Sequence, residues 1–245
     1  MAFGEPTEWY DEVTSTMEVA SRRGREGAPE GLLVVAARQT AGRGRLGRAW
    51  SSPEGGLWLS VLLRPNLPLT SLGLVGTCFA VAAAQAATEL AQIEVGIKWP
   101  NDLVVRGRKL AGLLSESHLQ GGIVDYLVLG MGLNLNVAPE AFPPELQQTA
   151  TSLLIETGTP VASSEFLPRF LDYSERLYRQ LVARLPHEII AGWRKMDSSA
   201  GRQVRLALDG VKTEGVALGI DDTGGLLVQV ADRTVSVGQG EVEWL

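Results

Sequence analysis

The sequence predicts an α+β fold, in which helices pack on one face of a mixed, mostly antiparallel sheet, followed by a small β-barrel of the SH3 type. In the first 197 residues, consecutive strand-like segments stand beside long apolar helices, which is typical of α+β domains. From residue 198 onward the pattern changes to short strands and tight turns. We therefore expect two domains, at residues 1–197 and 198–245.

The N-terminal part begins with three predicted strands and two predicted helices. The strands are expected at residues 9–13, 32–37 and 57–63. Ser15 follows the first strand and predicts a helix start, with Glu18 three residues later completing a capping box. The long apolar segment at residues 71–90 predicts a second helix, whose many alanines suit close packing against a sheet.

Hairpins, two further helices and the C-terminal module complete the prediction. Strands are expected at residues 97–99, 103–105, 109–118 and 126–132, with a tight turn at 106–108. The proline-rich residues 138–144 predict a surface loop, and helices are expected at 166–185 and 188–195, separated at Pro186. In the C-terminal module, strands are expected at residues 203–208, 213–220, 226–230 and 234–237, with hairpin turns at Asp209-Gly210 and Gly224-Gly225.

The composition is that of a globular chain and excludes several classes of site. Of the 245 residues, 45% are hydrophobic, and the net charge of -6 argues against general nucleic-acid binding. Cys78 is the single cysteine, so an internal disulfide and a thiolate zinc site are excluded, and we expect it in the core. His118 and His187 are too few for a histidine metal cluster. We find no signal peptide and no apolar run long enough to span a bilayer, and therefore expect a cytoplasmic protein without membrane or nucleic-acid partners.

The segment Gly42-Arg43-Gly44-Arg45-Leu46-Gly47-Arg48-Ala49-Trp50 carries the strongest functional signal. Its glycines match the spacing of a dinucleotide fingerprint, but no helix can follow, because a Ser-Ser-Pro-Glu-Gly-Gly run does. A P-loop is excluded too, since Arg48 and Ala49 stand where a lysine and a hydroxyl residue are required. The segment is therefore expected to be an irregular loop between two strands.

The chemistry of this loop suits an anion attached to a flat ring, such as a nucleotide or an acyl-nucleotide. If the loop is extended, Arg43 and Arg45 point to the same side, and their guanidinium groups match carboxylate and phosphate oxygens. Trp50 and the neighbouring Gln39 favour a ligand site. The alternative is a solvated, mobile basic loop without a ligand.

Three further segments combine charged, amide and small residues at strand ends. Lys98 precedes a proline turn that holds Asn101 and Asp102, which is either an ordinary turn or part of a site. Lys109 begins a strand with small residues that would let a ligand lie against the backbone, although for this segment alone a buried strand with a solvated first residue is the favoured interpretation. Asn134 and Asn136 end an apolar strand and either face a cleft together or cap the strand.

Taken in order, these motifs resemble the catalytic core of biotin protein ligases. The resemblance rests on the glycine-arginine loop and on the following segments: Lys98-Trp99-Pro100-Asn101-Asp102, Lys109-Leu110-Ala111-Gly112 and Gly132-Leu133-Asn134. It covers nearly the whole chain, including the C-terminal module. It implies the biotin/lipoate ligase-like core fold and an ATP-dependent, AMP-forming enzyme. Such an enzyme converts biotin to biotinyl-5'-AMP with release of pyrophosphate, and then transfers biotin to a lysine of a biotin carboxyl carrier domain.

The resemblance also implies a set of site residues. The biotin contacts would be Ser15, Thr16, Gln39, Gly42, Arg43, Lys109 and Gly112. The ATP and adenylate contacts would be Arg43, Arg45, Arg48, Trp50, Lys98, Asn101 and Asn134. The catalytic residues would be Arg43, Arg45, Asp102 and Lys109. Lys109 would touch the reacting carboxylate and the α-phosphate, and Asp102 would organise the Mg²⁺ that accompanies ATP or guide the acceptor lysine.

Two positions depart from the family pattern. Met17 stands where the family has asparagine after the Ser-Thr pair, so we leave it out of the site, and Leu46 stands where the loop often carries arginine. Because the Ser15-Thr16 pair lies close to Met1, the sequence leaves no room for a preceding winged-helix domain, and we expect a ligase-only form.

Three other functions compete with this prediction. A lipoate-protein ligase shares the fold and the acyl-adenylate chemistry, but it resembles the glycine-arginine loop poorly. A protein that binds an acyl-adenylate without turnover would not need Lys109 and Asp102. A nucleic-acid-binding regulator would need a basic face that the composition does not support. An exposed sheet edge could in addition pair two subunits as a homodimer.

Overall fold

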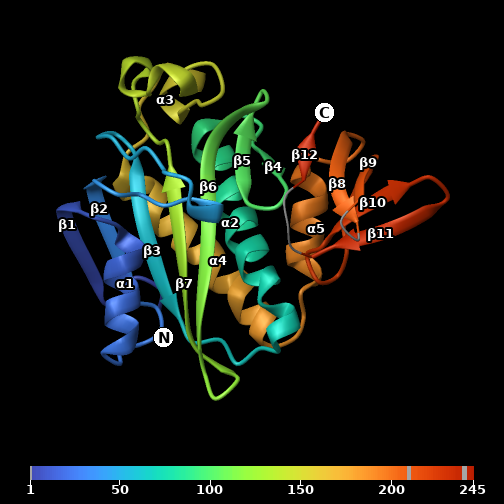
Figure 1. Cartoon of the computed structure of the whole chain (residues 1–245). Helices are drawn as coiled ribbons and strands as arrows, with labels where there is room; N and C mark the ends of the chain where they lie inside the picture. The colour runs from blue at the N-terminus through green and yellow to red at the C-terminus, as the bar shows by residue number, and fades with distance from the viewer. Residues whose placement is uncertain (1, 209–210, 239–241) are drawn as a thin grey trace.

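The first part of the chain forms a seven-stranded sheet with the strand order β1-β2-β3-β7-β6-β5-β4 (Figure 1). The computed structural model describes residues 2–208, 211–238 and 242–245. The strands are β1 (Thr7–Val13), β2 (Leu33–Gln39), β3 (Leu57–Leu63), β4 (Gly96–Lys98), β5 (Asp102–Val105), β6 (Arg108–Gln120) and β7 (Ile123–Leu133). Only the β1–β2 pair is parallel, so the predicted mixed, mostly antiparallel sheet is confirmed.

Helices cover both faces of the β2–β3–β7 part of the sheet. The helices are α1 (Thr16–Arg25), α2 (Gly73–Ala91), α3 (Leu153–Thr157), α4 (Ser163–Val182) and α5 (His187–Met196). The long helices α2 and α4 lie together on one face, behind the sheet in Figure 1, and share the main core with Leu59 and Val61 of β3. Leu62, which points to the opposite face, packs with residues of α1. Strand β3 is buried throughout because it is covered on both faces.

Helix α2 is a core helix although its composition resembles that of a membrane span. Residues 69–91 have a mean hydropathy of 1.5 over their most apolar window, so by length and composition alone they could cross a bilayer. The expectation that no apolar run is long enough was therefore wrong. The helix packs in the main core against α4 and α5, and Cys78 is fully buried there, as predicted.

Several local predictions need correction. The capping box is wrong: Ser15 occupies the N-cap position of α1, but its side chain makes no capping bond. Glu18 instead accepts a hydrogen bond of 2.6 Å from Thr14 Oγ1. The proline-rich loop contains two short 3₁₀ turns, at Pro139–Ala141 and Pro144–Leu146, and buries Phe142 between them. The short helix α3 was not predicted.

The C-terminal module is a five-stranded antiparallel sheet with the order β11-β10-β9-β8-β12. Its strands are β8 (Gln203–Leu208), β9 (Val211–Ile220), β10 (Leu226–Val230), β11 (Arg233–Val237) and the unpredicted β12 (Glu243–Trp244). Asp209-Gly210 lies outside the described residues, whereas Gly224 has the positive φ of 85° that the predicted turn needs. The division into domains at residues 197 and 198 stays a prediction.

Hydrogen bonds join the module to the edge of the first sheet. Trp99 Nε1 donates to the carbonyl of Gly224 at 3.0 Å, and Trp99 N donates to Ser199 Oγ at 2.9 Å. Ser198 N also donates to the carbonyl of Ile97 in β4. These bonds bring β12 to the end of the sheet at which the predicted site residues lie.

Candidate active site

One row of paired residues crosses four strands and forms the middle of the site. Lys98 in β4 pairs with Asp102 in β5, Asp102 with Gly112 in β6, and Gly112 with Gly132 in β7. Residues paired in this way across antiparallel strands project from the same face of the sheet. The row therefore places a cation and a carboxylate beside two positions that have no side chain.

The indole of Trp50 occupies the space above the two glycines. A Cβ on Gly132 would lie 2.4 Å from Trp50 Nε1, and a Cβ on Gly112 would lie 2.9 Å from the indole ring. Trp50 also packs against a small apolar cluster that includes Trp58 and Phe142. The glycines are thus required for the glycine-arginine loop to lie against the sheet.

A cavity of about 830 Å³ opens above this row. Its wall includes all the predicted site residues except Gly42: Ser15, Thr16, Gln39, Arg43, Arg45, Arg48, Trp50, Lys98, Asn101, Asp102, Lys109, Gly112 and Asn134. Gly42 instead closes the base of the loop, where its carbonyl accepts a hydrogen bond from Trp50 N and a Cβ would lie 2.5 Å from the carbonyl of Trp50. The cavity is of the size that holds small-molecule ligands.

Two lysines in this cavity have different surroundings. Lys109 Nζ lies 2.7 Å from Asp102 Oδ1 and 5.0 Å from the centre of the Trp50 ring. Lys98 Nζ lies 5.3 Å from the ring centre of Trp244, which comes from the C-terminal module. Burial lowers the pKa of the Lys98 amine, and the nearby Asp102 carboxylate opposes this effect. Both cations can meet an anionic ligand in a partly dehydrated environment, where charge interactions are stronger than in water.

The opposite end of the cavity is polar without charge. Gln39 Oε1 accepts hydrogen bonds from Thr16 N at 2.8 Å and from Thr16 Oγ1 at 3.2 Å, while Gln39 Nε2 donates to Ser52 Oγ at 2.9 Å. Thr16 Oγ1 also lies 2.8 Å from Ser60 Oγ. These bonds fix the side chain of Gln39 at the start of α1, beside the buried Ser15. The group is suited to a neutral ligand that both donates and accepts hydrogen bonds.

The glycine-arginine loop is folded back on itself rather than extended. Arg43 and Ala49 form an isolated bridge, and residues 45–47 form a 3₁₀ turn in which Leu46 has a φ of 56°. The alternation argument for Arg43 and Arg45 therefore does not apply. Arg43 Nη2 lies 3.5 Å from Glu116 Oε2, and Leu46 at the tip is 69% exposed.

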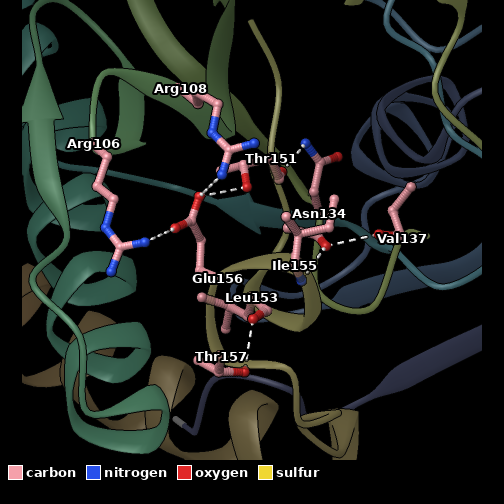
Figure 2. Close-up of polar contacts among 10 residues, drawn as sticks. Arg106, Arg108, Asn134, Val137, Thr151, Leu153, Ile155, Glu156 and Thr157 are labelled. Atoms are coloured by element: carbon pink, nitrogen blue, oxygen red, sulfur yellow. Dashed lines mark hydrogen bonds and ion pairs between the residues drawn. The ribbon is translucent and has the colours of Figure 1, made fainter. Parts of the chain in front are cut away.

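The asparagines have separate partners. Asn101 Nδ2 donates to the carbonyl of Leu113. Asn134 lines the cavity and donates to the carbonyl of Thr151 at 2.9 Å (Figure 2), whereas Asn136 exchanges hydrogen bonds with the backbone of Val161. The interpretation in which both asparagines face one cleft is therefore wrong.

Sequence reasoning missed several residues of the cavity wall. Met17 lines it and lies against Gly130, where a Cβ would approach its sulfur to 2.7 Å. Further wall residues come from the segment after β7 and from β12 with the residue before it: Phe142, Leu146, Thr149, Ala150, Val242, Glu243 and Trp244. Ser60, which supports Thr16, carried a signal, because it is the single polar residue in the apolar strand β3.

Carboxylates are sparse around the cavity. Asp102 and Glu243 line it, and the described part of the chain contains no group of three or more His, Cys, Asp or Glu residues that could hold a metal ion. This donor set cannot form an all-protein metal cage. It fits a Mg²⁺ ion that is held mainly by ligand phosphates and water, with one carboxylate from the protein.

Comparisons with known proteins identify relatives along the whole chain. Residues 9–134 match the Biotin/lipoate A/B protein ligase family, and residues 200–244 match the Biotin protein ligase C terminal domain. The bifunctional ligase/repressor BirA of Bacillus subtilis is 35% identical over 241 residues, which cover 98% of this chain and 74% of that protein. The biotin–[acetyl-CoA-carboxylase] ligase of Mycobacterium tuberculosis is 35% identical over 225 residues, covering 87% of this chain and 79% of the relative.

Two solved structures show the same fold. The biotin protein ligase from Aquifex aeolicus in complex with biotin and ATP superposes with a TM-score of 0.85 at 30% sequence identity, and the match covers 98% of each chain. The biotin protein ligase from Leishmania major in complex with biotinyl-5-AMP has a TM-score of 0.64 at 28% identity, covering 98% of both chains.

Proposed function

The chain belongs to the biotin protein ligase family and is an ATP-dependent, AMP-forming enzyme, and we propose that the cavity above the Lys98–Gly132 row is the place where it joins biotin to ATP. The reaction activates biotin as biotinyl-5'-AMP with release of pyrophosphate. The biotin is then transferred to a lysine of the biotin carboxyl carrier domain of a carboxylase.

The observation that carries the assignment is the division of one cavity into a neutral and a cationic end. Biotin has the same division, because its fused rings are neutral and its side chain ends in a carboxylate. Ser15, Thr16 and Gln39 would hold the fused rings, so that the carboxylate reaches Lys109. Gly112 lines the cavity beside Lys109 and would contact the ligand through its backbone, and the backbone around Gly42 and Arg43 would close over it.

The nucleotide would lie on the cationic side. Trp50 offers a flat face for the adenine, and Asn101 and Asn134 lie in the wall beside it. Arg43, Arg45 and Arg48 belong to the loop above the cavity, and Lys98 lies in the wall below it. Their charges would neutralise the phosphates from two sides.

The first step requires two anions to approach each other. A carboxylate oxygen of biotin attacks the α-phosphorus of ATP, a new phosphorus–oxygen bond forms, and the bond to the β-phosphate oxygen breaks to release pyrophosphate. Lys109 would neutralise both the attacking carboxylate and the α-phosphate, and Arg43 and Arg45 would neutralise the charge of the leaving pyrophosphate. Catalysis then comes from alignment and charge stabilisation, without a covalent intermediate on the protein.

A Mg²⁺ ion would accompany ATP. Bound Mg²⁺ supplies further neutralisation of the phosphate oxygens. Of the two carboxylates in the wall, Asp102 is the one that pairs with Lys98 across the sheet and contacts Lys109, so it is the carboxylate that would either face this Mg²⁺ or guide the acceptor lysine. The remaining ligands would be phosphate oxygens and water.

The second step transfers the acyl group. The amine of the carrier lysine attacks the acyl carbon of the adenylate, the carbon–oxygen bond to AMP breaks, and the amine loses a proton. Asp102 is suited to orient this amine or to accept its proton. Deprotonation matters because only the neutral amine is nucleophilic.

Pyrophosphate–ATP exchange with biotin, with lipoate and with neither tests the activity. We expect exchange that depends on biotin. Exchange with lipoate alone would retain the mechanism but contradict the substrate, and no exchange with either would show a binding protein without turnover.

Partners and location follow the same proposal. We propose a cytoplasmic enzyme that acts on a biotin carboxyl carrier domain and binds neither nucleic acid nor membranes. A homodimer stays a prediction: β1 is an edge strand of the sheet and exposes Trp9.

A further inference from the structure

A buried carboxylate lies just outside the cavity, on the short helix α3. The side chain of Glu156 is 1% exposed, and its Oε1 accepts hydrogen bonds of 2.6 Å from both Arg108 Nη2 and Thr151 Oγ1 (Figure 2). Arg106 Nη1 lies 3.3 Å from Oε2. A buried carboxylate is costly unless it is paired in this way, and breaking such a group is strongly destabilising. Glu156 does not line the cavity, so any effect on the reaction must pass through its neighbours.

Thr151 connects Glu156 to two residues of the cavity wall. Thr151 N donates to the carbonyl of Lys109 at 2.9 Å, and the carbonyl of Thr151 accepts a hydrogen bond of 2.9 Å from Asn134 Nδ2. Lys109 N in turn donates to the carbonyl of Thr149 at 2.7 Å. The backbone N–H and the carbonyl of Lys109 are therefore both hydrogen-bonded to residues 149–151. Figure 2 shows the Thr151 side chain between Glu156 and Asn134.

Glu156 also holds the residue that directly precedes Lys109. Arg108 begins β6, immediately after a turn in which Arg106 and Gly107 both have positive φ. The turn itself is solvent-exposed at Arg106, whose side chain is 75% exposed. The bonds to Glu156 therefore fix the start of β6 from one side, while Thr151 fixes it from the other.

We propose that Glu156 is a positioning residue for adenylation: by binding Arg108 and Thr151 together, it sets the place from which the Lys109 ammonium extends into the cavity and orients the Asn134 amide. This inference rests on the role proposed above for Lys109. A displacement of about 1 Å at a residue remote from the chemistry can lower a rate by about 100-fold, because reacting groups must be aligned closely. Loosening the start of β6 displaces the ammonium in this manner.

The test is Glu156→Gln in the full chain, measured by biotin-dependent pyrophosphate–ATP exchange. We expect kcat to fall about tenfold, which corresponds to about 1.4 kcal/mol of activation free energy. The KM for biotin should change less than about twofold. KM reports interactions that are made equally in the ground state and the transition state, and the residues that would make them with the biotin rings, Ser15, Thr16 and Gln39, are held by other elements. Unchanged kcat in the folded variant would overturn the proposal.

Glu30→Gln provides a matched control. Glu30 Oε1 also accepts two hydrogen bonds, from Tyr178 Oη at 2.7 Å and from Arg64 N at 2.9 Å, but at the opposite end of β3 from the site. Both variants should lower the midpoint of urea unfolding, whereas only Glu156→Gln should lower kcat. An equal loss of kcat in both variants would show a general effect of stability and contradict positioning.

A double-mutant cycle with Lys109→Met separates positioning from other causes. If Glu156 acts through Lys109, Glu156→Gln should reduce kcat less than about twofold in the Lys109→Met background, because coupled residues are non-additive. If Glu156→Gln lowers kcat by the same factor in both backgrounds, the inference is overturned. Wild-type exchange activity in Lys109→Met would also overturn it, because Lys109 would then have no role in adenylation. Absence of exchange in the wild-type chain would instead contradict the proposed function.

If Glu156→Gln fails to fold, a second variant tests the same proposal. Thr151→Val keeps the shape of the side chain and removes only its hydrogen bond to Glu156. We expect the same pattern, a lower kcat with little change in the KM for biotin. Wild-type kcat in Thr151→Val would show that this link does not position Lys109.

Discussion

At the scale of single residues, Gly112 and Gly132 decide where the Trp50 indole can lie in the cavity. They leave the space that the Trp50 indole occupies, and the buried Nε1 of Trp50 has no hydrogen-bond partner among the described residues. A buried donor without a partner is costly. Close packing against the backbone of Gly132 therefore holds this edge of the indole in place.

Gly132→Ala should therefore weaken ATP binding. The new methyl group would occupy the position of the indole and force Trp50 away from the sheet. We expect the Kd for ATP to rise about tenfold, or about 1.4 kcal/mol, while biotin binding changes little, as measured by calorimetry with each ligand. Gly76→Ala in α2, where a Cβ meets nothing within 4 Å, is the control. Equal ATP affinity in Gly132→Ala and the wild type would contradict the placement of the nucleotide.

Asp102 is expected to act on the acceptor amine in the transfer step, in addition to its contact with Lys109 during adenylation. Asp102→Asn removes the carboxylate that faces Lys109 and should slow transfer to the carrier more than it slows adenylation. Single-turnover measurements of each half-reaction separate the two rates. The control is Asp125→Asn, which removes a carboxylate paired with Arg64, away from the cavity. Equal slowing of both steps would refute a role of Asp102 toward the acceptor amine.

Much of the site could be predicted from single residues because its chemistry is concentrated in short segments. Lys98, Asp102 and Lys109 carry charge at strand ends, and pairing in the sheet then brings them together. Glu156 could not be predicted in this way. Its partners come from β6 and from the segment after β7, and only the folded chain shows that its carboxylate is buried.

At the scale of elements, the glycine-arginine loop is the segment most suited to move. Arg43 is held by an exposed contact with Glu116, which is worth little in water. A ligand with several negative charges competes for Arg43 and would draw the loop over the cavity. Closure would keep water from the adenylate, which hydrolysis destroys.

Limited proteolysis measures this closure. We expect cleavage between Gly42 and Trp50 in the free protein and protection when biotin and ATP are both bound. Arg45→Gly should release biotinyl-adenylate into solution and label lysines of bystander proteins with biotin. Unchanged cleavage with both ligands present would count against closure. The same release assay on Arg48→Gly compares the effect of Arg45 with that of a second arginine in the loop.

Element prediction succeeded where burial controls the pattern and failed where it does not. The strand predicted at residues 57–63 coincides with β3, because a continuous apolar run fits a strand covered on both faces. Helix α3 and strand β12 have five and two residues, too few for a periodic pattern to emerge. The capping box failed because the Thr14 hydroxyl binds Glu18 instead.

At the scale of the whole molecule, the C-terminal module contributes directly to the cavity. Val242, Glu243 and Trp244 line it, and Trp244 lies over Lys98. The aromatic ring shields Lys98 from water, which agrees with the lowered pKa of that amine. The module would therefore help to hold the phosphates.

Trp244→Ala tests this contribution. Exposing Lys98 to water weakens its interaction with phosphate, because the effective dielectric constant rises. We expect a several-fold increase in the KM for ATP, on the order of 1 kcal/mol, and no change in the KM for biotin. Leu245→Ala alters the neighbouring residue and serves as the control. A normal KM for ATP in Trp244→Ala would show that the module has no part in nucleotide binding.

The most direct measurement of the central claim is a crystal structure of the chain with biotin and a non-hydrolysable ATP analogue. We predict the fused rings of biotin beside Ser15, Thr16 and Gln39, the adenine against Trp50, and the biotin carboxylate and the α-phosphate both within hydrogen-bond distance of Lys109. Ligands bound outside this cavity, or a carboxylate and an α-phosphate that do not share Lys109, would contradict the account.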